Sequence, residues 1–93
     1  MREQKIEQQL VKAVKKMGGM CPKFISPGFD GMPDRLVLLP NGKAGFVEVK
    51  CLGEKLRAIQ VRRAEQLQSL GQKAFVLDCV EQITKILEEI KNG

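Results

Sequence analysis

Two β-rich runs joined by a short turn constrain the fold of this 93-residue chain more than any other feature. The runs cover residues 35–39 and 44–51, and residues 40–43 (Pro-Asn-Gly-Lys) join them. Proline suits the first central position of a type I turn, asparagine the second, and glycine the left-handed position that follows. The turn therefore predicts an antiparallel hairpin in which Leu39 pairs with Lys43.

The predicted register brings three charged side chains to one end of the hairpin. Counting back from the turn sets Asp34 opposite Glu48, on the same face of the sheet, with Cβ atoms about 5 Å apart. Lys50 lies two residues further along that face. Two carboxylates so placed can bind Mg²⁺ or Mn²⁺ through oxygen ligands, and a nearby ammonium can orient an attacking water and offset charge on a phosphorane. The arrangement predicts metal-dependent phosphodiester hydrolysis.

Each of these residues alone also has an ordinary structural interpretation. Asp34 could simply start a strand, Glu48 could be a solvated strand residue, and Lys50 could be its surface ion-pair partner. Their combination is much rarer, because it follows a loop of residues 26–33 rich in proline and glycine and includes a turn in the correct register. The combination favours an active site.

Helices are predicted around the hairpin. Apolar spacing indicates helices over residues 3–17, 56–70 and 80–90, a buried strand over residues 73–79, and an edge strand over residues 20–26 that Pro22 interrupts. The hairpin is apolar on both faces, so helices must cover both sides of the sheet. We therefore expect a single α/β domain over residues 1–93, of order α-β-β-β-α-β-α, with a mixed sheet flanked by helices. The inward positions expected in the second helix and the last strand are Ile59, Ala64, Leu67, Leu70, Phe75, Val76 and Leu77.

Composition narrows the chemistry. Sixteen Lys and Arg residues against eleven Asp and Glu give a net charge of +5, which favours a polyanionic partner such as DNA. The chain has no histidine and no tyrosine, which excludes imidazole chemistry and a phosphotyrosine intermediate. Four phenylalanines and no tryptophan supply a poor stacking platform for single strands, so contact with a duplex backbone is expected.

Other absences bear on the setting of the protein. The three cysteines are widely separated and are expected to be reduced thiols in a cytoplasmic protein. No window approaches the roughly 18 apolar residues that a membrane span needs. The sequence also lacks a glycine-rich phosphate loop, so no nucleotide cofactor is expected.

The sequence also resembles a known family over most of its length. The carriers of the resemblance are residues 31–34 (Gly-Met-Pro-Asp), residues 46–50 (Phe-Val-Glu-Val-Lys), Gln60, and residues 67–71 leading into residues 75–77. In these motifs the chain resembles the VRR-NUC domain, a compact branch of the PD-(D/E)xK nuclease superfamily with a restriction-endonuclease-like core. The spacing is similar to that of stand-alone, virus-type members, which makes a phage or prophage setting the expectation.

The resemblance implies roles for individual residues. Asp34 and Glu48 would ligate the metal together with the backbone carbonyl of Val49, and Lys50 would be the catalytic lysine. Gln60 matches the helix glutamine of the family and is expected to point toward the site; its alternative is a boundary glutamine that bonds to the backbone. Glu7 is a candidate further metal ligand. Glu3 is its nearest competitor, although a glutamate in a first helical turn is often explained by the helix dipole.

The resemblance further implies a structure-selective endonuclease that cuts branched DNA such as Holliday junctions and works as a homodimer. Two alternatives are a flap- or end-directed or restriction-like nuclease, and a DNA-binding module without turnover. Basic residues around the predicted cleft are candidate phosphate contacts, although charges on a helix usually form only a solvated face. These candidates are Lys23, Arg35, Lys55, Arg57, Arg62 and Arg63.

Overall fold

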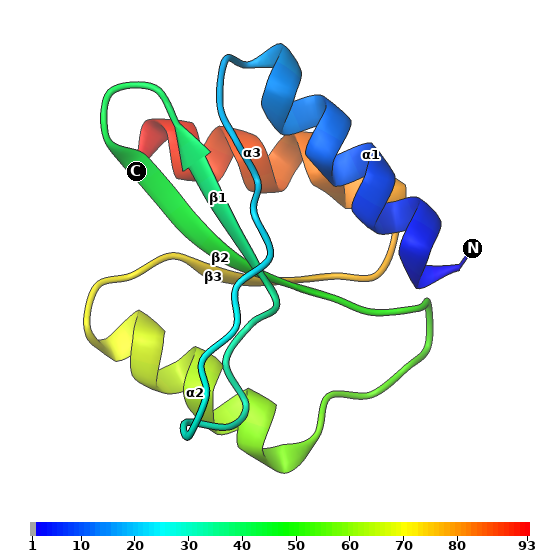
Figure 1. The fold of residues 1–93 in the computed structure, drawn as a ribbon, viewed down its shortest axis with the longest axis vertical. Coiled ribbons are helices and arrows are strands. Elements are labelled where there is room, and N and C mark those ends of the chain that lie inside the picture. The colour runs from blue at the N-terminus through cyan, green and yellow to red at the C-terminus, as the bar shows by residue number, and fades with distance from the viewer. Residues whose placement is uncertain (1) are drawn as a thin grey trace.

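A three-stranded mixed sheet lies between two layers of helix in the computed structural model, which describes residues 2–93 (Figure 1). The elements are α1 (Glu3–Lys16), β1 (Arg35–Leu39), β2 (Lys43–Val49), α2 (Ala58–Ser69), β3 (Ala74–Leu77), the short 3₁₀-helix η1 (Val80–Gln82) and α3 (Ile83–Asn92). The predicted α/β class, with helices on both sides of a mixed sheet, is confirmed. Among residues 2–93, none of the helices has the length and apolar character that crossing a membrane would require.

The hairpin has the predicted register. β1 and β2 pair antiparallel from Leu39↔Lys43 at the turn to Arg35↔Val47 at the open end. The turn itself differs from the prediction, because Asn41 and Gly42 both have positive φ, at 67° and 72°. Both residues are therefore in the left-handed region, which asparagine and glycine tolerate better than other residues. The assignment of Asn41 to a type I position was therefore wrong.

β2 is the central strand. β3 pairs with it in parallel, from Phe46↔Ala74 to Val49↔Leu77, and α2 forms the crossover between them. A parallel pair needs such a long connection, which is why a helix separates these two strands in the sequence. The result places the ends of β2 and β3, and the start of β1, at the same end of the sheet.

The expected edge strand at residues 20–26 is not a continuous strand. Met20 and Leu38 exchange two backbone hydrogen bonds of 2.9 Å, and a second isolated bridge joins Lys23 to Arg35. Pro22 lies between the two bridges and has no N–H, so the ladder is interrupted there. The segment nevertheless runs beside β1 and leads into the loop before Asp34.

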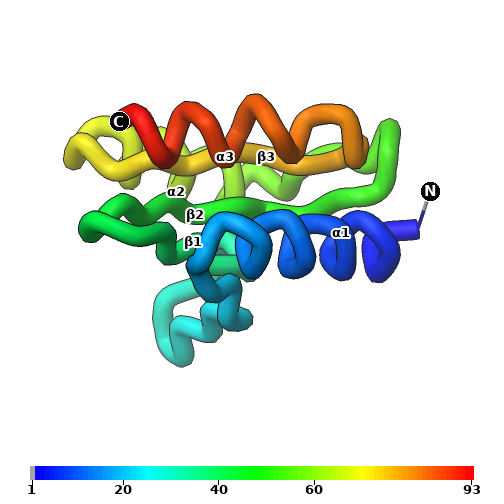
Figure 2. Tube along the Cα trace, turned by 90° about the horizontal axis from the view of Figure 1, so that it is seen from above, coloured from blue at the N-terminus to red at the C-terminus, as the bar shows by residue number. Residues whose placement is uncertain are grey.

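The main core lies between the sheet and the layer formed by α1 and α3. Figure 2 looks onto this layer and shows the two helices next to each other over the strands. The fully buried side chains of this core come from α1, α3 and alternate positions of the strands: Ile6, Leu10, Val14, Val37, Val47, Val49, Leu77 and Ile90.

The layer formed by α2 covers the opposite face less completely. Leu67 is buried as predicted, but Leu70 is 74% exposed and Val76 is 39% exposed, so both were wrongly assigned to the interior. Leu70 follows the last residue of α2, where the chain turns away from the helix, and Val76 is on the edge strand β3.

Candidate active site

Asp34 lies at the open end of the hairpin, directly before β1. Continuing the register by one pair sets it opposite Glu48, as predicted. Its Oδ1 accepts a hydrogen bond of 3.1 Å from the backbone N–H of Val49, which ties the side chain to the end of β2. The bond leaves Oδ2 without a partner on another described residue.

Glu48 projects from β2 into the α2 side of the sheet and is only 8% exposed. Its Oε2 accepts a hydrogen bond of 3.2 Å from Gln60 Nε2 and lies 3.8 Å from Lys50 Nζ. Lys50 immediately follows β2, two residues after Glu48, so both side chains emerge on the same face. All four predicted catalytic side chains therefore come together at one end of the sheet.

Gln60 has two contacts, one to each side of its amide. Its Oε1 accepts a hydrogen bond of 2.8 Å from the backbone N–H of Arg57, which caps the first turn of α2, while its Nε2 donates to Glu48. Gln60 thus makes the backbone bond of one interpretation and the contact with Glu48 of the other. The helix start and the central strand are joined through this one buried side chain.

Burial and mutual repulsion make the carboxylates costly to ionise. Desolvation, followed by repulsion from Asp34, raises the pKa of Glu48 from 4.5 to about 7, and Lys50 only partly opposes this. Desolvation also raises the pKa of Asp34, against the lowering effect of the Val49 N–H. Two carboxyl groups that share a buried site with a single ammonium carry an excess of negative charge when both are ionised.

The donor set fits a hard divalent cation. Asp34 Oδ2 and Glu48 Oε1 are not bonded to any other residue among positions 2–93, and the backbone carbonyl of Val49 belongs to the residue that holds Asp34. Carboxylate and carbonyl oxygens are the ligands that Mg²⁺ and Mn²⁺ prefer. A cation bound there would also relieve the repulsion that raises both pKa values.

The two glutamates of α1 have different surroundings. Glu7 Oε2 accepts from Arg35 Nε at 3.0 Å and lies 2.9 Å from its Nη2, so this carboxylate already has a cation partner. Glu3, one turn earlier, is half-buried. Burial and repulsion from Glu54 and Asp34 raise its pKa, and Lys50 opposes this. Glu3 is therefore the α1 glutamate without an arginine partner, whereas Glu7 is held by Arg35.

A group near Lys50 was not anticipated from the sequence. Ligand atoms of Glu3, Cys51 and Glu54 all lie within 4.8 Å of one another, and Glu54 Oε1 accepts a hydrogen bond of 3.0 Å from Cys51 N. Cys51 and Glu54 follow the catalytic strand in sequence, which is a local signal. The approach of Glu3 is a tertiary contact that no spacing along the chain announces.

The predicted DNA-contacting residues fall into two groups. Arg35, Arg57 and Arg63 have partners within the protein: Glu7 for the first and the loop before Asp34 for the other two. In contrast, Lys23, Lys55 and Arg62 form no ion pair within the described residues. The second group is the one available to bind phosphates.

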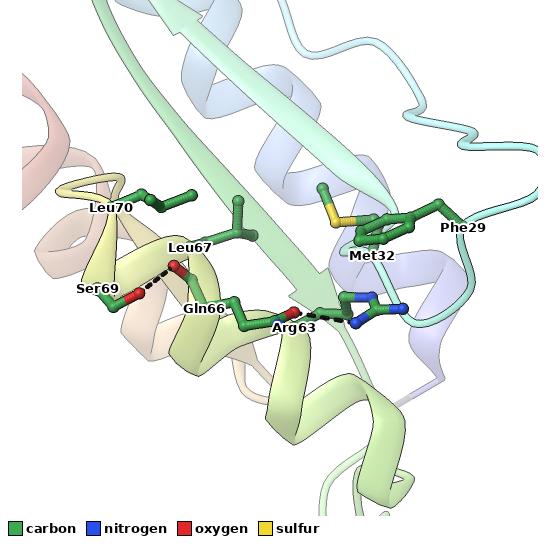
Figure 3. Close-up of a pocket in the computed structure, with 7 residues that line it drawn as sticks. All are labelled: Phe29, Met32, Arg63, Gln66, Leu67, Ser69 and Leu70. Atoms are coloured by element: carbon green, nitrogen blue, oxygen red, sulfur yellow. Dashed lines mark hydrogen bonds between the residues drawn. The ribbon is translucent and has the colours of Figure 1, made fainter.

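Arg63 anchors the loop that precedes Asp34. Its guanidinium lies 3.8 Å from the centre of the Phe29 ring, and its Nε donates to the carbonyl of Asp30 at 2.8 Å. Figure 3 shows Arg63 and Phe29 at one end of a hollow of about 400 Å³ between this loop and α2, with Gln66 bonded to the same guanidinium. Arg63 is thus a structural contact of α2 in this fold.

Comparisons with known proteins agree with this geometry. The chain is 53% identical over 77 residues to "Putative nuclease p44" of Acyrthosiphon pisum secondary endosymbiont phage 1, a match that covers 83% of each protein. A solved structure described as a VRR_NUC domain superposes with a TM-score of 0.86 at 32% identity, covering 92% of this chain and 94% of the other. No protein-family model matches the sequence.

The fold and these two comparisons identify a nuclease domain, in which Asp34 precedes β1 and Glu48 and Lys50 lie at the end of β2. Within that class, the solved structure and the phage relative identify the branch. The chain belongs to the VRR-NUC family.

Proposed function

We propose that this protein is a Mg²⁺- or Mn²⁺-dependent endodeoxyribonuclease with Asp34, Glu48, Lys50 and Gln60 as its catalytic residues. One observation carries the proposal. The buried Glu48 carboxylate has Asp34 opposite it, Lys50 Nζ at 3.8 Å and Gln60 Nε2 at 3.2 Å. An ordinary solvated strand glutamate has no reason to be buried beside a second carboxylate.

The residues divide the work between holding a metal ion and handling the attacking water. Asp34, Glu48 and the carbonyl of Val49 would hold the ion, with Glu7 or Glu3 as the further acidic ligand from α1. When bound, the ion polarises the scissile phosphate and lowers the pKa of a water molecule. Lys50 could hydrogen-bond the attacking water and offset the charge that develops on the phosphate oxygens. Gln60 keeps Glu48 in one orientation, because it is itself fixed by the backbone of α2.

Branched DNA, with four-way junctions first, is the proposed substrate. Residues 2–93 offer no recognition helix or aromatic platform that would read bases. Of the basic residues without an ion-pair partner, Lys55 is exposed in the loop before α2 and Arg62 is exposed on α2. A homodimer would bring two such sites to the two strands of a junction. The competing functions are a flap-directed, end-directed or restriction-like nuclease activity, and DNA binding without turnover.

Cleavage of an end-labelled four-way junction beside its linear duplex arms tests the proposal. Reactions contain Mg²⁺, Mn²⁺ or EDTA, and compare the wild type with Lys50→Ala. We expect junction cuts that need the metal and disappear in the variant. A product ladder from linear duplex would favour the end-directed alternative, and DNA binding without cuts in any metal would overturn the catalytic proposal.

The further acidic ligand can be assigned in the same assay. Glu3→Gln and Glu7→Gln each remove one carboxylate with little change of shape. The variant that raises the Mn²⁺ concentration needed for half-maximal cleavage identifies the ligand. If neither variant changes it, Asp34, Glu48 and the Val49 carbonyl are sufficient.

A further inference from the structure

A surface groove of about 440 Å³ lies between α1 and the extended segment that follows it. In Figure 1 this segment descends from the end of α1 past β1. One wall is a row of α1 residues spaced four apart, Gln4, Gln8 and Lys12, which therefore lie along one side of the helix. The rest of the lining is Glu7, Val11, Lys23 and Arg35.

The groove carries excess positive charge. Glu7 and Arg35 form an ion pair of 2.9 Å, and Arg35 Nη1 also donates to the carbonyl of Cys21 at 2.8 Å, so these two charges compensate each other. Lys12 and Lys23 are both exposed, and neither has an ion-pair partner within residues 2–93. The uncompensated charge of the lining is therefore two ammonium groups on opposite walls.

The groove reaches the end of the sheet that carries Asp34. Arg35 directly follows Asp34 in the chain, and Lys23 is joined to Arg35 by a backbone bridge. Successive side chains of a strand point to opposite faces, so Arg35 points toward α1 whereas the next position, Asp34, points toward the α2 side. A chain of phosphates lying in the groove would therefore reach the same end of the sheet as the carboxylates, from the α1 side. No aromatic side chain lines the groove, so it offers nothing on which a base could stack.

We infer that this groove binds the sugar-phosphate backbone of one strand of the DNA substrate next to the site of cleavage. Lys12 and Lys23 contact phosphates from the two walls, and the side-chain amides of Gln4 and Gln8 donate to phosphate or sugar oxygens between them. The inference rests on the proposed function for its choice of polyanion. It extends the binding surface to α1, on the side of the site opposite Lys55 and Arg62, and assigns contact without base reading.

DNA binding measured without cleavage tests the inference. Fluorescence anisotropy of a labelled four-way junction and a labelled linear duplex is followed in EDTA over a series of salt concentrations. The test variant is Lys12→Ala/Lys23→Ala. The matched control is Lys85→Ala/Lys91→Ala, which removes the same net charge from exposed lysines of α3 that line other hollows of the surface.

The logarithm of the affinity falls as the logarithm of the salt concentration rises, and each lost phosphate contact reduces the magnitude of this slope by about 0.9. We expect the test variant to lose about 2 from this slope and to bind roughly tenfold or more weakly at about 0.1 M salt. Gln8→Glu, which adds a charge to the same wall, should weaken binding as well. The control should bind like the wild type, and all variants should keep the melting temperature of the wild type.

An unchanged slope in Lys12→Ala/Lys23→Ala would overturn the inference, and so would an equal loss in the control. A change in sedimentation of the variant without a change in DNA affinity would assign the groove to contact with a second copy of the chain. These outcomes are separate from failure of the proposed function, which is read from metal-dependent cleavage by the wild type.

Discussion

The two faces of the sheet differ in how completely they are covered. On the face toward α1 and α3, Val37, Val47 and Val49 are fully buried under two helices. On the face toward α2, Leu36, Leu38 and Phe46 are only partly buried, and Glu48 is the buried residue at its end. A dense apolar face can supply most of the folding free energy, which leaves the other face able to hold repelling carboxylates.

The largest expected effect comes from placing a charge in the well-covered face. Val47→Asp introduces a carboxylate where no partner is available, at a cost of several kcal/mol that approaches the whole stability of a small domain. We expect the variant to be unfolded by circular dichroism. Val61→Asp, on the exposed side of α2, should change the free energy of unfolding by no more than about 1 kcal/mol. Similar effects of the two changes would contradict the division between the faces.

The next largest effect concerns the contact between the loop before Asp34 and α2. Gly31 has a φ of +87°, and a Cβ atom there would lie 2.7 Å from the Ile59 side chain and 2.8 Å from its carbonyl oxygen. Gly31→Ala should cost about 2–4 kcal/mol, because both the backbone strain and the overlap are unfavourable, and it should reduce cleavage by displacing Asp34.

Gly28→Ala is the matched control for that prediction. Gly28 also has a positive φ, of +78°, but a Cβ atom there meets nothing within 4 Å. The control should therefore cost only the backbone strain, about 1 kcal/mol. Urea denaturation of both variants measures the difference. Equal costs would show that the Ile59 contact does not hold the loop.

A third effect, smaller again, depends on pH. Because the pKa of Glu48 is raised from 4.5 to about 7, the metal-free folded protein keeps a proton that the unfolded chain has already lost between these values. The stability of the metal-free protein should therefore fall as the pH rises through this window. Glu48→Gln should remove that dependence and exceed the wild type by about 1–3 kcal/mol near pH 8, with little difference near pH 4.

Denaturation in EDTA across this pH range measures the effect. Glu65→Gln, an exposed carboxylate of α2, serves as the control and should follow the wild type. Mn²⁺ should restore the stability of the wild type at high pH, because it binds the folded state, but should not stabilise Glu48→Gln to the same extent. A wild type whose stability rises between pH 5 and 8 in EDTA would contradict the raised pKa.

The features that could be predicted from the sequence are those set by contacts between residues close in the chain or by the alternation of side chains along a strand. The pairing of Leu39 with Lys43 followed from the turn, and the position of Asp34 opposite Glu48 followed from counting. The partners of long side chains did not follow, because Arg35 and Glu7 are 28 positions apart and Arg63 and Asp30 are 33 apart. Such pairs depend on how whole elements pack, and a basic residue beside a site is as easily a structural contact as a ligand of DNA.

The smallest effects distinguish two neighbouring arginines of α2. Arg63 is bonded to the Phe29 and Asp30 loop, so Arg63→Ala should cost about 1–2 kcal/mol and lower cleavage modestly, while leaving the salt dependence of DNA binding unchanged. Arg62 is exposed and has no ion-pair partner among residues 2–93. Arg62→Ala should therefore leave stability unchanged and lower the salt slope by about 1. Melting curves and anisotropy titrations of the two variants separate the roles, and the opposite assignment would mean that Arg63 leaves its loop to bind DNA. In that case the weakly covered face of the sheet would rearrange on substrate binding, whereas the face under α1 and α3 would not.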